Sequence, residues 1–169
     1  AVAGMFYPAE TTTLERTVAE LLAAVPAGGD GAKAIIAPHA GYRYSGLTAA
    51  HAYRLLEGRR ERIRRVVLLG PAHRVYLQGM ALPSVDAFTT PLGDVPVDAD
   101  GVTTALALPG TRISDAAHAE EHSLEVHLPF LQTVLDDFRL VPIVVGVCSA
   151  SEVKTVLEAL WDGDETIIV

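Results

Sequence analysis

The chain has 169 residues, half of them hydrophobic, and a net charge of −8, so we expect one domain (1–169) with a substantial core. The acidic balance excludes a broad nucleic-acid surface, because phosphate binding needs a dense basic face. No stretch reaches the roughly 18 apolar residues of a membrane helix. Cys148 is the only cysteine, so we expect no internal disulfide and a protein of the reducing cytoplasm.

The first predicted elements are a helix and a strand. Thr12 and Glu15 form a capping-box pair, and the pair Gly28-Gly29 ends the helical pattern that follows. The apolar run 33–37 then predicts a buried strand. A turn-rich loop leads from this strand to a second helix, for which Ser45 is the predicted cap.

The rest of the chain alternates between strands and helices. Further strands are predicted over 65–69, 80–85, 140–147 and 166–169, and residues 88–93 form a predicted loop. Further helices are predicted from Asp98 to Leu106, over 124–135 with Pro129 in the first turn or at a kink, and over 151–161. This alternation predicts βαβ units, hence an α/β fold with a largely parallel sheet.

Two histidines each follow an apolar strand. His39 comes after run 33–37 through Pro38, and His73 closes the run that begins at Val66. Ligands and catalysts of open α/β sheets gather outside the carboxyl ends of the strands, so we expect both imidazoles to bind one metal ion. Together with a carboxylate or a thiolate, two histidines suit Fe(II), Cu or Zn, and the third ligand decides between them.

A second group of residues suggests different chemistry. His118-x-x-Glu121-His122 fits the inverted zincin pattern. On a helix both imidazoles would lie on one face, and the glutamate could activate a zinc-bound water. The alternative is a capping and hydrogen-bonding network at the start of a helix.

Three motifs, taken together and in order, resemble the Memo family, whose bacterial and archaeal members are called AmmeMemoRadiSam system protein B. They are Pro38-His39-Ala40-Gly41-Tyr42, Gly70-Pro71-Ala72-His73 and Glu121-His122-Ser123-Leu124-Glu125. The resemblance covers essentially the whole chain. It implies a three-layer α/β/α fold with a central sheet, similar to the class III extradiol dioxygenases, which use non-haem Fe(II).

The resemblance also implies roles for individual residues. His39 and His73 match the family's two metal-binding histidines, whereas its further site residues follow segments that would lie after Val169. We therefore expect the third ligand to lie outside this chain and the domain to lack its C-terminal part. Within the chain we expect His122 or Tyr42 to move protons.

Glu121, His122 and Glu125 are expected to order the wall of the pocket. The leading functional hypothesis is a non-haem metal oxidoreductase acting on an unknown small molecule, with Fe(II) ahead of Cu or Zn. A metal-binding or adaptor protein without turnover is the first alternative, and a zinc hydrolase using His118, Glu121 and His122 is the second. The family name further implies a radical SAM protein and an AMMECR1-like protein as partners.

Overall fold

A mixed sheet forms the centre of the molecule in the computed structural model, which describes residues 1–28 and 32–169. Within these residues five strands pair in the order β5-β2-β6-β1-β7. Their bounds are β1 (Arg65–Pro71), β2 (Met80–Leu82), β5 (Thr111–Ile113), β6 (Arg139–Val145) and β7 (Thr166–Ile168). Among the described pairs of this five-stranded sheet, only β2–β6 is antiparallel. The prediction of an α/β fold with a largely parallel or mixed sheet is confirmed.

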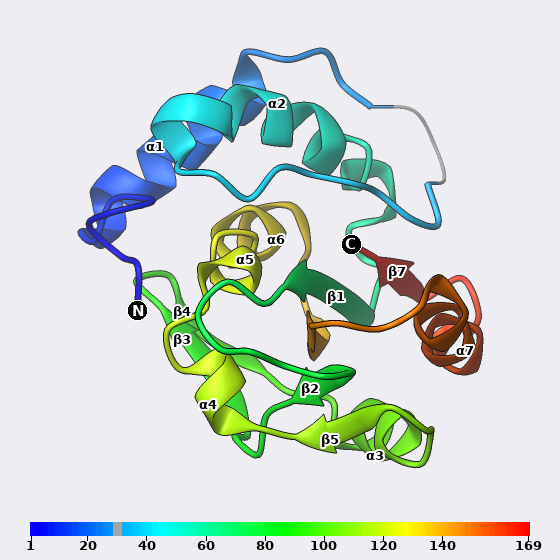
Figure 1. Ribbon diagram of the computed structural model, residues 1–169. Coiled ribbons are helices and arrows are strands. Elements are labelled where there is room, and N and C mark those ends of the chain that lie inside the picture. Colours follow the sequence, from blue (N-terminus) through cyan, green and yellow to red (C-terminus); the bar gives the residue numbers. More distant parts are fainter. Residues whose placement is uncertain (29–31) are drawn as a thin grey trace.

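Helices lie on both sides of this sheet (Figure 1). On one side are α1 (Thr11–Ala23), α2 (Tyr42–Arg54), α5 (His122–Glu125) and α6 (Leu128–Val134), and on the other are α3 (Ala99–Leu106) and α7 (Ala150–Leu160). The remaining elements are the short helix α4 (Asp115–His118), the 3₁₀ turn η1 (Glu57–Arg59) and the hairpin of β3 (Ala87–Thr90) and β4 (Gly93–Pro96).

The two faces of β1 pack into two separate cores. Val66 and Leu68 contribute to the core shared with α1, α2 and α6, whereas Val67 contributes to the core shared with α3 and α7. All three side chains are fully buried. A strand covered on both faces needs apolar residues at successive positions rather than alternating ones, which explains the unbroken apolar run in the sequence.

The strand predicted over 33–37 does not form. Ala34 makes only an isolated bridge to Ile168, and the side chain of Ile36 is 100% exposed. The segment pairs with β7 on one side, but among the described residues no strand pairs with its other side. The apolar run therefore lies at the edge of the sheet rather than inside it.

Two further predictions fail around the hairpin. The strand predicted over 80–85 ends at Leu82, just before Pro83, which has no N–H to donate to a ladder. Residues 88–93 were expected to be a loop but contain β3 and the start of β4. Gly93, with φ +112°, supplies the left-handed conformation that this tight turn needs.

The helix starts are partly corrected. The cap of α1 is Glu10, whose carboxylate accepts the N–H groups of Thr12 and Thr13, and α2 begins at Tyr42, so that Ser45 lies inside it. Asp98 caps α3 as predicted. Gly29, predicted to help end the first helix, lies outside the described residues. No helix in the described part of the chain is long and apolar enough to cross a membrane.

Candidate metal centre

Three histidines from distant parts of the chain form what we call the histidine cluster: His39, His73 and His122. The ring centroids of His39 and His73 are 5.2 Å apart, and those of His73 and His122 are 4.6 Å apart. One ring nitrogen from each residue lies within 4.8 Å of the other two. The structure thus brings together the two histidines singled out in the sequence and adds a third.

Close packing between β1 and α5 places two of these rings side by side. His73 follows the carboxyl end of β1, and His122 is the first residue of α5. A Cβ atom at Gly70 would lie 2.5 Å from Oγ of Ser123, so only glycine permits this approach. The Ser123 hydroxyl donates to the carbonyl of Pro71 at 2.9 Å and fixes α5 against the end of the strand.

Glu121 orients the ring of His73. Its carboxylate lies 2.9 Å from Nδ1 of His73 and accepts the backbone N–H groups of His73 at 2.6 Å and Ser123 at 2.9 Å. Burial favours the neutral acid, but these hydrogen bonds outweigh it and lower the pKa of Glu121 to about 2. An ionised carboxylate only accepts, so Nδ1 of His73 carries a proton, and in the neutral tautomer Nε2 would offer the lone pair.

The other two rings also suit a metal. Burial lowers the pKa of His39 and of His122, which keeps both rings neutral and able to donate a lone pair. Nδ1 of His122 is buried and has no hydrogen-bond partner among residues 1–28 and 32–169, although it lies 3.3 Å from Glu121. Two nitrogens bound to one ion at about 2.1 Å lie at most about 4.2 Å apart, so the rings need only a small movement to share an ion.

The cluster opens to solvent through a shallow cavity of about 490 Å³ beside His39 and His122. Phe6 forms one side of this opening, with its ring centroid 4.5 Å from that of His122. Tyr44 lines it as well and is largely exposed. A small molecule could therefore reach the histidine cluster from outside.

Tyr42, which we expected to be a proton carrier, makes a structural contact. Its hydroxyl is buried and donates to the carbonyl of Val126 at 2.8 Å, and burial raises its pKa well above the ordinary value. Tyr42 also does not line the opening beside His39. It fixes the start of α2 against the chain after α5, so the structure gives no support for proton transfer by this residue.

The helix required by the inverted zincin pattern is absent. α4 ends at His118 and α5 begins at His122, with a break between them. Nε2 of His118 lies 3.1 Å from the carbonyl of Ala81, and His118 is not part of the histidine cluster. Glu121 is the cap of α5, accepting the N–H of Ser123, as the alternative interpretation of this segment expected.

The sequence placed His122 in the pocket, as a proton carrier or part of its wall, but did not reveal it as a candidate ligand. We expected the third ligand beyond the chain, yet His122 offers a nitrogen to the same point as His39 and His73. The sequence signals were Gly70, which permits close packing, and the acidic cap before an apolar helix. Neither signal indicates which strand end the helix approaches.

The fold and the cluster define an α/β protein with a candidate metal centre at the carboxyl end of a central strand. The family described as Memo-like protein matches residues 1–167, and the chain belongs to this family. The prediction made from the three motifs is thereby confirmed.

Several curated relatives support this assignment. A MEMO1 family protein of Methanopyrus kandleri is 37% identical over 99% of this chain and 62% of its own length. One from Archaeoglobus fulgidus is 40% identical over 94% of this chain and 58% of its own length. Protein MEMO1 of Homo sapiens is 38% identical over 89% of this chain and 52% of its own length. The chain thus spans between half and two thirds of the length of these relatives.

Proposed function

We propose that this chain forms a divalent metal centre in which His39, His73 and His122 are ligands and Glu121 orients His73. The observation that supports this most directly is the convergence of three imidazole nitrogens within 4.8 Å. A carboxylate that holds the far nitrogen of one ring is the usual support of a metal-binding histidine. Nδ1 of His122, which is buried and lacks a hydrogen-bond partner in the described part of the chain, also suits a metal ligand.

The donor set favours Fe(II), Cu or Zn, the ions that imidazole suits best. We place Fe(II) first because of the resemblance to the dioxygenases, although their usual site has two histidines and one carboxylate. A bound ion would supply Lewis acidity and, for iron or copper, one-electron chemistry. The residues of this chain would hold the ion with neutral rings and admit a small substrate past Phe6 and Tyr44.

The broader activity is also a proposal. We favour an oxidoreductase acting on a small molecule, with metal binding without turnover as the alternative. The three-imidazole set favours that alternative because it departs from the iron triad. A cytoplasmic location, and a radical SAM protein and an AMMECR1-like protein as partners, remain predictions from the single cysteine and from the family resemblance.

Metal content tests the ligand assignment. Metal-free protein is titrated anaerobically with Fe(II) and separately with Zn(II), and bound metal is measured by mass spectrometry and calorimetry. We expect about one ion per chain in the wild type and a loss of affinity of more than about 100-fold in His39→Ala, His73→Ala and His122→Ala. His51→Ala is the matched control, since His51 is exposed on α2. Retained affinity in all three variants would show that no such centre exists.

Oxygen uptake then separates the two functional candidates. Fe(II)-loaded protein is offered small aromatic substrates in an oxygen electrode. An oxidoreductase consumes oxygen in the wild type and loses that activity in His39→Ala and His73→Ala. Stoichiometric metal without oxygen uptake would favour a metal-binding protein without turnover.

A further inference from the structure

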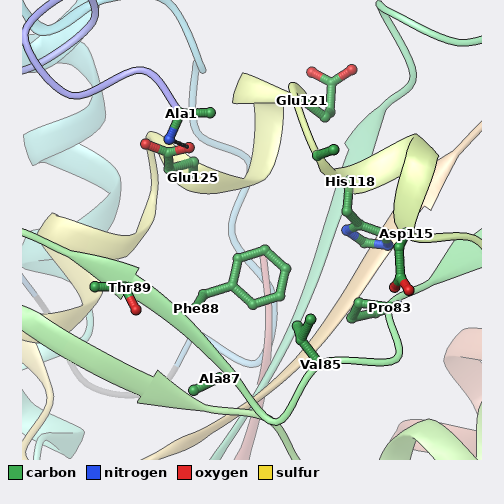
Figure 2. A pocket seen from close by; sticks show the side chains of 11 residues that line it. Ala1, Pro83, Val85, Ala87, Phe88, Thr89, Asp115, His118, Glu121 and Glu125 are labelled. Atoms are coloured by element: carbon green, nitrogen blue, oxygen red, sulfur yellow. Dashed lines mark hydrogen bonds and ion pairs between the residues drawn. The ribbon is translucent and has the colours of Figure 1, made fainter.

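A second cavity, of about 320 Å³, lies between the β3–β4 hairpin and the α4–α5 segment, and we call it the hairpin cavity (Figure 2). Its lining residues are Ala1, Pro83, Val85, Ala87, Phe88, Thr89, Asp115, His118, Ala119, Glu121 and Glu125. None of the rings of the histidine cluster lines it. Its volume lies within the size range of small-molecule sites.

One wall of the hairpin cavity is apolar. Pro83, Val85 and Phe88 form it, and the ring of Phe88 lies between the two ends of the cavity in Figure 2. Val85 is 47% exposed although it is a large apolar residue. This wall can bury the hydrocarbon part of a ligand.

Carboxylates lie at two ends of the cavity, with Asp115 beside Pro83 and Glu125 at the far end (Figure 2). Asp115 accepts the N–H and the hydroxyl of Ser84 at 2.7 and 2.6 Å, and these bonds lower its pKa, so it is ionised at neutral pH. Glu125 lies at the other end, where Figure 2 shows the amino group of Ala1 against it, at 2.8 Å. These carboxylates disfavour an anion and favour a cation in the cavity.

His118 lines the hairpin cavity between these ends. A carbonyl only accepts, so Nε2 of His118, 3.1 Å from the carbonyl of Ala81, carries the ring proton. Burial lowers the pKa of His118 and keeps the ring neutral. Nδ1 is then a bare acceptor, and it is buried without a hydrogen-bond partner among the described residues.

We propose that the hairpin cavity binds a small primary or secondary amine, as its ammonium, attached to an apolar or aromatic body. The body packs on Val85 and Phe88, and the ammonium faces the carboxylate of Asp115. An aromatic face close to a cation adds a favourable electrostatic contact. The proposal does not depend on metal binding at the histidine cluster.

The test compares three probes of similar shape and different charge: 2-phenylethylamine, 2-phenylethanol and phenylacetate. Binding is followed by NMR through the imidazole signals of the histidines. We expect saturable binding of the amine, with a shift of the His118 imidazole signals. Phenylacetate should bind at least ~10-fold more weakly, because the carboxylates that line the cavity repel an anion. Equal or tighter binding of phenylacetate would overturn the proposal. So would perturbation centred on His73 and His122, which would place the probe in the histidine cluster.

Variants locate the site independently. Val85→Trp should fill the cavity and abolish amine binding, whereas Ile113→Trp, at a comparably exposed position (44%) outside the lining, should not. Asp115→Asn should weaken amine binding about threefold, as expected for one partly exposed charge. Asp94→Asn, in the β3–β4 hairpin but outside the lining of the cavity, should leave amine binding unchanged. Thermal melting checks that each variant folds. Wild-type affinity in both Val85→Trp and Asp115→Asn would refute the assignment.

Discussion

Glu121 connects several features of the site through one side chain. It caps α5, holds the backbone of His73 and orients the His73 ring. Its backbone position also borders the hairpin cavity (Figure 2). Because the carboxylate fixes which nitrogen of His73 is protonated, at the proposed metal centre it would orient the donor without being a ligand itself.

Replacing Glu121 with glutamine should therefore weaken metal binding without removing it. The amide keeps the shape but loses the charge that supports the imidazole, and we expect a 10- to 100-fold loss of affinity, measured by calorimetric titration with Zn(II). The neighbouring exposed residue Glu120 provides the control, as Glu120→Gln. Unchanged affinity in Glu121→Gln would mean that the His73 ring needs no carboxylate support.

A buried polar pair joins α2 to α6 beneath the site. The hydroxyl of Tyr53 lies 2.5 Å from Nδ1 of His127, and the Tyr53 ring stacks on Phe130 with centroids 4.9 Å apart. Both members of the pair are buried. Burial, with a smaller contribution from the charge of His39, lowers the pKa of His127 to about 4.

This pair predicts a pH dependence of stability. The unfolded chain protonates His127 below about pH 6.5, whereas the folded chain resists protonation down to about pH 4. Neutral His127 therefore contributes on the order of 3 kcal/mol to the free energy of unfolding. This contribution is complete above pH 6.5 and is lost as the pH falls to about 4. Urea unfolding at pH 7, 6, 5 and 4.5 gives the free energy of unfolding as a function of pH. In His127→Asn this free energy should fall less steeply with decreasing pH, by up to one proton, whereas in His51→Ala its pH dependence should be unchanged. Equal slopes in His127→Asn and the wild type would contradict the pKa assignment.

At the scale of the whole molecule, the edge of the sheet beside β7 differs most from expectation. The segment around Ile36 has the composition of a buried strand but pairs only with β7. The chain spans 52–62% of the length of its curated relatives. In the chain as described, the two adjacent isoleucines of this segment have opposite environments: Ile35 is 6% exposed and Ile36 is 100% exposed.

The two isoleucines allow a matched comparison. Ile35→Ala should lower the free energy of unfolding by about 2–4 kcal/mol through loss of buried surface, while Ile36→Ala should change it by less than about 0.5 kcal/mol. Urea denaturation of both variants measures this directly. Similar losses in the two variants would show that Ile36 is buried in solution, as the sequence pattern alone predicts.

Local patterns predicted most of the architecture because each has a direct physical cause. The buried run of β1, the cap at Asp98 and the positions of His39 and His73 after apolar runs were all recognisable in the sequence. The role of His122 was not, because it depends on the packing of α5 against β1. The edge position of Ile36 was also hidden, since periodicity reports hydrophobicity but not the number of neighbouring strands.

The short distance between the imidazoles of His73 and His122 depends on the absence of a Cβ atom at Gly70. A single methyl group at this position would meet the Ser123 hydroxyl at 2.5 Å and act as a wedge between strand and helix. The rings of His73 and His122 would then move apart, although both histidines remained in the chain. A substitution at Gly70 would thus change the distance between the two rings, although Gly70 itself is not one of the proposed ligands.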